Sequence, residues 1–429
     1  MIEILNCSYL IFFLLVFFRF KLSDTLLKKV LLIKNVSLLD KYSFNILLLS
    51  FIFLVFSFFK INQLMLISIL FLISIISLTF KNRNFLNTKL SFNYNFFLIF
   101  VFTLIISTEI ISNPKLEWDG QAVWYFKALN FYEDLSFFNL AETPTPAYPH
   151  LGGVLWSILW KVSFLNYEYF GRIIYVFIYV ISVLIVADKV SKNTKLKIAF
   201  SLAFFFLTYD KFLFGGYQEY LLFSLIIIIF NFLDKINLRK INFHQIIFIT
   251  LSSYILLWVK NEGIVYFLFI ILYLFYFVPI RKKLLILLLF LLLIVIKFTL
   301  FYKLNGNLNL LNLDLFNDSN SFIDFSLTNF VGEILLITQH IIIAFFKYPI
   351  WLIFFLSLFL KKMEKKEMYI LYFGTVSLIF IYAAFLSSKT DLYWHVTGSL
   401  DRIVIQIFGF FMIFMSYRLK YFSKKFFKS

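Results

Sequence analysis

The residues best suited to chemistry lie in one polar segment, NPKLEWDGQAVWYFKALNFYEDLSFFNLAETPTPAYPHLGG (113–153). It contains Glu117 and Asp119, and a carboxylate can accept a proton from a hydroxyl nucleophile or share a metal ion with a second carboxylate. Trp118 and Trp124 stand on either side of Asp119, which suits a pocket for a sugar or a lipid headgroup. Asp119 is therefore the first candidate for a reacting group, and an ordinary solvated loop carboxylate is the alternative.

A second polar cluster, KNEG (260–263), interrupts an apolar stretch that otherwise runs over 246–278. Lys260 should have an anionic partner if it lies at lipid depth, because an ammonium there is rarely left alone. A simple polar turn closed by glycine is the alternative. Glu219, which follows two consecutive glycines, is a further acidic candidate.

The third candidate segment is SSKTDLYWHVTGSLDR (387–402). If its second half is helical, four polar residues form one stripe along the helix: Asp391, His395, Ser399 and Arg402. A forked guanidinium at the end of this stripe could hold a phosphate, with His395 as a second donor. The alternative is an arginine that reaches toward the interface beside an ion-paired Asp401, with a structural histidine.

Other chemistries have no signal in the chain. Four histidines and one cysteine, without zinc-ligand spacing, argue against a histidine-built zinc site. The phosphate-binding glycine motifs of P-loop and Rossmann proteins are missing, so a soluble nucleotide is not the expected donor. We expect no cofactor and assign no metal ligand; a divalent metal is allowed by the carboxylates but not favoured.

The elements that must position these residues are membrane helices. Of the 429 residues, 62% are hydrophobic and 15% are charged, against about 25% charged in a soluble domain. The apolar runs are continuous rather than alternating, and many approach the roughly 20 residues that cross a bilayer as a helix. The sequence predicts an all-α polytopic membrane protein in one transmembrane domain, 1–429, with no separate soluble domain and about thirteen spans (11–15): 4–18, 43–59, 61–80, 94–112, 170–187, 198–213, 219–233, 245–259, 264–279, 284–301, 333–359, 368–386 and 401–417.

The basic residues predict the orientation of these spans. Of 40 Lys and Arg residues, 28 fall on one side of the alternating topology, with only 6 of the 23 acids, in segments 19–42, 81–93, 188–197, 234–244, 280–283, 360–367 and 418–429. The positive-inside rule makes that side cytoplasmic. The N-terminus then lies outside, with 4–18 as a retained span, and the C-terminus lies in the cytoplasm. The net charge of +17 is explained by topology and by attraction to anionic lipid, so no nucleic-acid partner is expected.

The candidate residues lie on the opposite, outward face. Its main segments are 113–169, 302–332 and 387–400. The apolar run 151–164 is short and contains Lys161, and we place it as a helix in the membrane interface, where Trp156 and Trp160 would suit it. Counting it as a span would move the basic clusters outside.

Four patches together resemble the GT-C superfamily of membrane glycosyltransferases, in particular the bacterial dolichyl- or polyprenyl-phosphate-mannose-protein mannosyltransferase-like branch. They are EWDGQAVWYFKA, AYPHLGGVLWSILWK, WVKNEG and DLYWHVTGSLDR. The resemblance implies a GT-C-like fold with interfacial helices in the first large outward loop. It also implies inverting sugar transfer from a polyprenyl-phosphate carrier, at the non-cytoplasmic face of the cell (inner) membrane, to a glycan, lipid or protein acceptor.

Site residues carried over from this resemblance fall into two groups. Asp119 matches the base that activates the acceptor, with Glu117 beside it. The lipid phosphate and sugar would be bound by residues of the same patches: Tyr148, Lys127, Lys260, Glu262, Trp394, His395 and Arg402. Glu219 lies outside the patches and is added to this group from its own sequence context. Cations in this set would stabilise the charge that develops on the departing phosphate.

Two other classes of membrane protein remain open. A transporter or flippase of a lipid-linked or anionic solute would need charged or helix-breaking residues near the middle of the bilayer. Lys297 and Lys347-Tyr348-Pro349 are the obvious candidates, and both could lie near helix ends. A polysaccharide polymerase or ligase would share the lipid-phosphate leaving group and differ in its acceptor.

Overall fold

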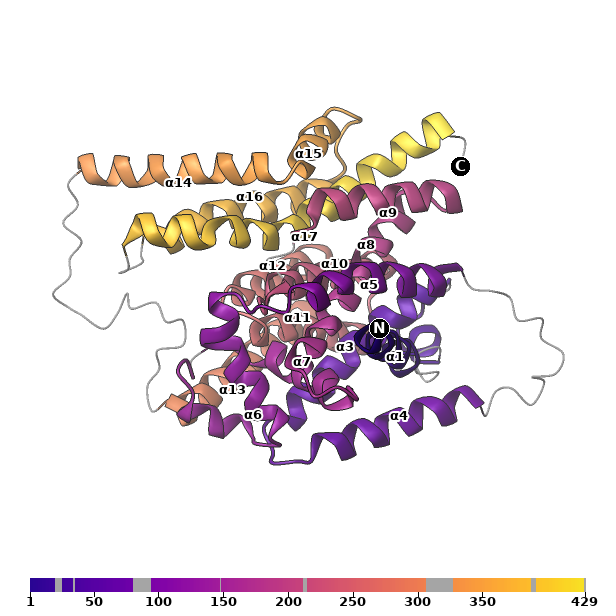
Figure 1. The fold of residues 1–429 in the computed structure, drawn as a ribbon. Helices are drawn as coiled ribbons and strands as arrows, with labels where there is room; N and C mark the ends of the chain where they lie inside the picture. The colour runs from indigo at the N-terminus through magenta and orange to yellow at the C-terminus, as the bar shows by residue number, and fades with distance from the viewer. Residues whose placement is uncertain are drawn as a thin grey trace. The chain divides into compact units, whose positions relative to one another are not determined.

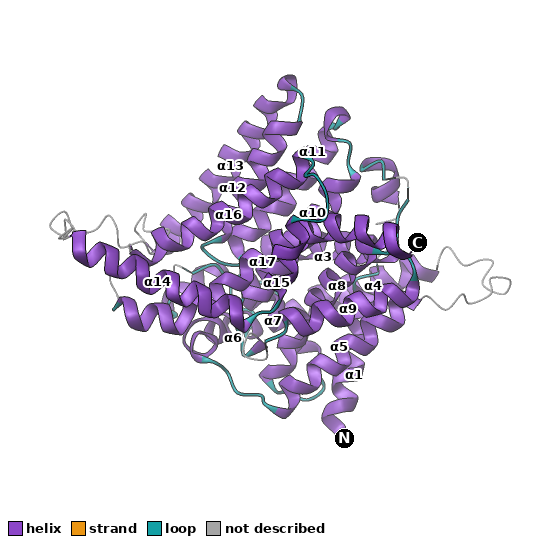
Figure 2. Ribbon diagram, turned by 90° about the horizontal axis from the view of Figure 1, so that it is seen from above, coloured by secondary structure: helices purple, strands orange, loops and turns teal. Residues whose placement is uncertain are grey.

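The regular structure of the described residues is all helical. This computed structural model describes residues 1–19, 25–33, 35–79, 94–146, 148–210, 214–305, 327–386 and 391–427. Within these ranges every regular element is a helix or a single helical turn, and no strand occurs (Figure 2). The prediction of an all-α chain is confirmed.

Seven helices within the described ranges are long and apolar enough to cross a membrane. They are Leu38–Phe56, Tyr94–Ser112, Glu168–Val190, Ile280–Leu304, Phe330–Lys347, Lys365–Leu386 and Leu392–Ser423. A helix rises about 1.5 Å per residue, so 18 or more residues approach the roughly 30 Å of the hydrocarbon core. The chain thus has the helices of a multi-pass membrane protein.

The helices behind these spans are α3 (Leu38–Phe56), α5 (Tyr94–Ser112), α8 (Ile173–Val190), α13 (Ile280–Asn305), α14 (Leu327–Lys347), α16 (Lys365–Leu386) and α17 (Leu392–Phe427). The other six predicted spans also coincide with helices, but each helix has fewer than 18 residues: α1 (Ile2–Phe17), α4 (Gln63–Thr79), α9 (Thr194–Thr208), α10 (Glu219–Lys235), α11 (Phe243–Tyr254) and α12 (Gly263–Phe277). The total of thirteen spans therefore stays a prediction.

The predicted span 333–359 is broken in two. α14 ends at Lys347, and α15 (Ile350–Leu358) begins after Pro349. Proline has no backbone N–H and fixes φ near −65°, so it starts a helix easily but cannot continue one. The hydropathy of this stretch is nearly continuous, which is why composition alone predicted one span.

The bounds of the last helix also differ from the prediction. α17 begins at Leu392, inside the predicted outward segment 387–400, and continues to Phe427. Within that segment, 387–390 lie outside the described residues, as does most of the predicted loop 302–332.

The chain divides into two compact units. Unit 1 comprises 1–184 and 211–300, and unit 2 comprises 185–210 and 301–429. In unit 1, every residue of α10 from Glu219 to Leu233 is buried, whereas only 22% of the most apolar part of α13 is buried. In unit 2, α16 and α14 both pack along α17 (Figure 1). Candidate spans occur in both units.

The first large loop forms a compact helical insert in unit 1. It contains η2 (Gly120–Trp124), α6 (Tyr125–Tyr132), η3 (Phe137–Glu142), α7 (Leu151–Val162) and η4 (Glu168–Arg172). α6 can approach α7 closely because Gly153 has no side chain; a Cβ there would lie 2.8 Å from the Cβ of Lys127.

α7 is the helix that we expected to lie in the membrane interface. It has 12 residues, fewer than the roughly 20 that cross a bilayer, and its place in the interface stays a prediction. Its two tryptophans lie inside the protein: Trp156 is 0% exposed and Trp160 is 7% exposed. The indole N–H of Trp156 donates to the carbonyl of Glu168 at 2.8 Å.

Candidate functional site

The acidic segment of the first loop is fixed to the chain that precedes α10. The backbone N–H of Glu117 donates to the carbonyl oxygen of Gly215 at 2.9 Å. Gly120 packs on the same glycine, and a Cβ at position 120 would lie 2.3 Å from that carbonyl oxygen. Gly216 has a φ of +102°, a conformation that favours glycine. The glycines at both segments therefore allow a backbone-to-backbone contact that sets the position of Glu117.

Asp119 and its neighbouring tryptophans differ in exposure. Asp119 is half-buried at the start of η2. Trp118 is 65% exposed, whereas Trp124 is buried and its ring lies 6.1 Å from the ring of Tyr148. The two tryptophans thus do not form one aromatic pocket around Asp119, but Tyr148 is held near the same turn.

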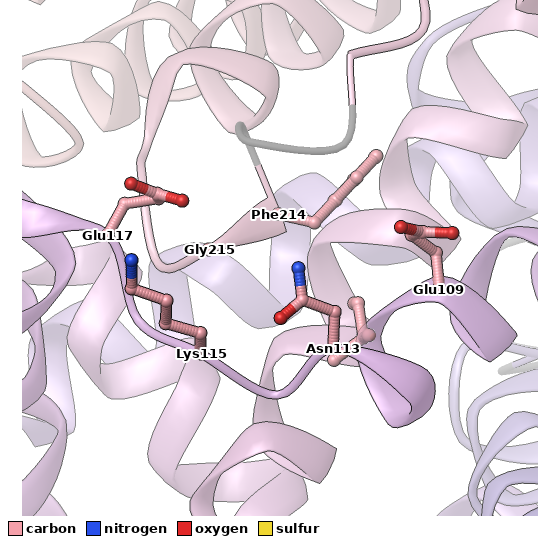
Figure 3. A pocket seen from close by; sticks show the side chains of 7 residues that line it. Glu109, Asn113, Lys115, Glu117, Phe214 and Gly215 are labelled. Carbon is pink, nitrogen blue, oxygen red and sulfur yellow. The ribbon is translucent and has the colours of Figure 1, made fainter.

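A small hollow lies beside the acidic segment. Figure 3 shows Glu117 and Lys115 at one side of it and Glu109 at the other, with Asn113 between them. Ile110, Phe214 and Gly215 complete the lining, so both chain segments of the backbone contact border the same space. Its volume is about 10 Å³, which is about the minimum that can hold one water molecule. The hollow is therefore too small to enclose a ligand larger than water.

The anionic partner expected for Lys260 is Glu219. The Lys260 Nζ lies 3.0 Å from one carboxylate oxygen of Glu219 and 3.4 Å from Glu262. Glu219 is the first residue of α10 and only 1% exposed, and Lys260 is 8% exposed. Glu219 follows Gly216 by three residues, so the pair begins close to the glycine segment on which the acidic segment is anchored.

Gln218 links this pair to α7 and α8. Its side-chain amide donates to the hydroxyl of Tyr175 at 3.0 Å, and that hydroxyl donates to the carbonyl of Gly152 at 2.8 Å. A Cβ on Gly152 would lie 1.7 Å from the Gln218 amide oxygen. The start of α10 is therefore held on one side by the acidic segment and on the other by α7.

Lys127 is buried and not open to a ligand. Its ammonium group donates to the carbonyl of Thr145 at 2.8 Å, and burial lowers its pKa to about 7. Near it, the Nε2 of His150 lies 2.8 Å from the Ser57 hydroxyl. The pKa of His150 is well below its usual value, first because of burial and then because of Lys127 and Lys297. Lys127 and His150 thus pack inside the loop, and a buried Lys127 is poorly placed to bind a phosphate.

The residues predicted from segment 387–402 belong to unit 2. The segment is helical from Leu392, as the stripe requires: the N–H of His395 donates to Asp391 O at 3.0 Å, and the Ser399 hydroxyl donates to His395 O at 2.7 Å. The ring of His395 packs 4.8 Å from Phe385. Trp394 is 58% exposed, and Arg402 is half-buried. Unit 1 thus brings together the acidic segment, Glu219, Lys260 and Glu262, whereas Trp394, His395 and Arg402 lie in unit 2.

Sequence reasoning missed an ionic cluster in unit 2. Lys347, the last residue of α14, lies 3.0 Å from Asp210 and 2.6 Å from Asp401. The Tyr348 hydroxyl donates to Asp210 at 2.9 Å. Asp401 therefore pairs with Lys347. The signal in the sequence was the charge beside Pro349. Asp210 falls within the predicted apolar span 198–213, and nothing in that span indicates a partner for it.

Lys297 is a second cation inside an apolar helix. It lies well within α13 rather than near its end, is 6% exposed, and donates to the carbonyl of Leu257 at 2.7 Å. Its ammonium also lies 5.7 Å from the centre of the Trp258 ring. It belongs to unit 1.

Comparisons with known proteins found no match. No protein-family model matches it, and no curated protein or solved structure is significantly similar to it. In the part of the chain that the structure describes, no three His, Cys, Asp or Glu side chains are grouped so that they could hold a metal ion.

Proposed function

We propose that this protein is a membrane glycosyltransferase that moves a sugar from a polyprenyl-phosphate carrier to an acceptor glycan, lipid or protein. The reaction would take place at the non-cytoplasmic face of the cell membrane, with inversion at the sugar. Asp119 would take the proton of the acceptor hydroxyl, with Glu117 beside it. Lys260 would stabilise the departing lipid phosphate.

One observation supports this proposal above the others. The segment that carries Glu117 and Asp119 is anchored by its backbone to Gly215, and the same stretch of chain leads directly to Glu219 and its ion pair with Lys260. A base and a cation on fixed backbone are what an inverting displacement needs, because one activates the nucleophile while the other stabilises the leaving group.

The pairing of Lys260 suggests how a phosphate would bind. Glu219 is almost fully buried, whereas the Glu262 side chain is 23% exposed and lies farther from the ammonium. A phosphate approaching from the exposed side would replace Glu262 and leave the Glu219 contact intact. The exchange conserves the charge balance around Lys260, so it avoids the cost of an unpaired buried cation.

The test is sugar transfer from a lipid-linked donor in proteoliposomes that contain purified protein. Asp119→Asn should lower the transfer rate by about 100- to 10,000-fold, the usual contribution of a general base, and Glu117→Gln should have a smaller effect. Glu133→Gln removes an exposed carboxylate of the same loop and serves as the matched control. A correctly inserted Asp119→Asn protein that transfers sugar at the wild-type rate would refute the proposal.

Cells provide an independent readout for the same proposal. Deletion of the gene should cause a polyprenyl-phosphate sugar to accumulate, and only variants that retain Asp119 should reverse the accumulation. Unchanged lipid-linked sugars together with unchanged surface glycans would count against a transferase. A polymerase or ligase would use the same leaving group, and the identity of the lengthened or ligated acceptor would distinguish it.

The second candidate is a transporter or flippase of a lipid-linked or anionic solute. It is favoured by the helix break at Pro349 beside the Lys347 cluster, and by the position of Lys297 within α13. Charged groups at a broken helix are typical of transport pathways. A flippase would move labelled lipid across the proteoliposome membrane without forming a new glycosidic bond, and Lys347→Met would slow it while Asp119→Asn would not.

A further inference from the structure

A cleft in unit 2 collects basic and aromatic side chains at one end of two candidate spans. It has a volume of about 300 Å³, and its lining includes Lys361, Lys366, Tyr417, Lys420 and Tyr421. Lys361 and Lys366 flank the start of α16, and the other three residues lie on the C-terminal part of α17. Because these antiparallel helices both belong to candidate spans, the cleft lies where the pair would leave the hydrocarbon core.

Arg418, which follows Tyr417 in the chain, is fully buried. Its guanidinium donates to the carbonyls of Ser357 and Leu358, both at 2.9 Å, and so binds the last carbonyls of α15 to α17. It also lies 3.3 Å from the carboxylate of Glu367. One cation thus satisfies the end of α15 and pairs with the first turn of α16, which carries part of the cleft lining.

The acids in the cleft are neutralised from within. Glu367 pairs with both Arg418 and Lys361, the latter at 2.7 Å, and Glu364 pairs with Lys361 at 3.1 Å. Three lysines and two glutamates therefore line the cleft, and the buried Arg418 pairs with one of these glutamates. Cations outnumber acids here, so the site has a net positive charge, to which the half-buried Lys366 and the exposed Lys420 both contribute.

The tyrosines add features that a simple basic patch lacks. Tyr417 and Tyr421 offer hydroxyl donors and apolar ring faces in the same cleft. The ammonium of Lys189 lies 5.7 Å from the centre of the Tyr417 ring. A ligand that fits this lining has a singly charged anionic head and an apolar remainder.

We propose that this cleft binds the phosphodiester headgroup of an anionic phospholipid. Tyrosine and lysine are typical of the membrane boundary, and basic residues there attract the anionic lipids of the cytoplasmic leaflet. The cleft involves segments 360–367 and 418–429, which the charge distribution of the sequence assigns to the cytoplasmic side. A lipid bound there would brace the α15–α16 connection against α17. The site is separate in its residues from the proposed transfer chemistry of unit 1.

The test is retention of defined lipids by the purified full-length protein, measured by native mass spectrometry. The protein is equilibrated in detergent with dioleoylphosphatidylglycerol or with dioleoylphosphatidylcholine at equal concentration. Lys366→Gln combined with Lys420→Gln should weaken phosphatidylglycerol binding by about 25-fold, because each lysine at such a surface contributes about 1 kcal/mol. Arginine at both positions should restore binding.

The matched control is Arg239→Gln combined with Lys240→Gln, which removes two exposed charges from another basic segment of the predicted cytoplasmic side. The proposal requires that this control retain phosphatidylglycerol as the wild type does, and that phosphatidylcholine be retained weakly by both. Equal loss in the two double variants would mean non-specific attraction and overturn it. Displacement of the lipid by millimolar glycerol phosphate would also overturn it, since the site would then recognise a free phosphate ester.

Discussion

The buried pair of Glu219 and Lys260 can be tested by a double-mutant cycle. Lys260→Met removes the cation that lies 3.0 Å from a carboxylate which is 1% exposed. Glu219→Gln removes the carboxylate but leaves Lys260 within 3.4 Å of Glu262. Lys260→Met therefore leaves a buried carboxylate without its cation, whereas Glu219→Gln leaves a cation that still has one carboxylate nearby. The double variant has neither of the two buried charges.

The expected magnitudes follow from these geometries. Removing one partner of a buried ion pair costs about 3–5 kcal/mol, because the other charge stays in a medium that solvates it poorly. We expect Lys260→Met to fall in this range. Glu219→Gln should cost less, because Glu262 still compensates the ammonium. The double variant should be more stable than either single variant, since well-packed neutral residues can replace a buried pair at little cost.

The only cysteine of the chain provides the assay. Cys7 is fully buried in unit 1, so a thiol-reactive dye should label it only as the protein unfolds in detergent. The midpoint of labelling on heating or in SDS should rank the wild type and double variant above Glu219→Gln, and Glu219→Gln above Lys260→Met. Lys240→Met changes an exposed lysine and is the control. Additive losses in the double variant would refute the conclusion that the pair acts as one buried unit.

Three further predictions use the same unfolding assay. Burial lowers the pKa of Lys127 from 10.5 to about 7, so between these pH values the unfolded chain binds one more proton than the folded chain. The free energy of unfolding should therefore rise with pH in this window, by up to about 1.4 kcal/mol per pH unit. Lys127→Met should remove this pH dependence. Gly120→Ala places a Cβ 2.3 Å from a backbone oxygen and should cost about 1–3 kcal/mol, whereas Gly332→Ala in the open face of α14 should be neutral or stabilising. Arg418→Lys should still destabilise the protein by about 1–3 kcal/mol, because a lysine cannot reproduce the fork that bonds the last carbonyls of α15; a stability equal to the wild type would mean that charge alone matters there.

The helices could be predicted from the sequence because their main determinant is local. A continuous apolar run in a chain of this composition needs a helix to satisfy its backbone. Twelve of the thirteen runs each coincide with one α-helix, and 333–359 coincides with two. The break before α15 was predictable in principle from Pro349, but the average hydropathy of 333–359 concealed it. The start of α17 was missed because the helix continues into a polar segment that hydropathy assigns to a loop.

The candidate site could be predicted only in part, because burial and pairing depend on contacts distant in the sequence. The sequence indicated that Lys260 needs an anionic partner. It did not indicate that this partner is Glu219, which lies 41 residues away in the chain. Lys127 was expected to face a ligand, and no local pattern indicates that α6 turns it into the protein. Asp210 was overlooked because a carboxylate inside an apolar run gives no sign of its partner, which lies 3.0 Å away at the end of α14.

α10 and α13 are similar in composition, yet substitutions should accumulate in them at different rates. The most apolar part of α13 is largely open to its surroundings, so one aliphatic side chain can replace another there with little change in contacts. α10 is enclosed on every side from Glu219 to Leu233, and each change of shape must be absorbed by neighbours packed at the density of a crystal. Between related sequences, Leu, Ile and Phe should therefore interchange freely along α13 and keep their positions along α10, although both helices are strongly apolar.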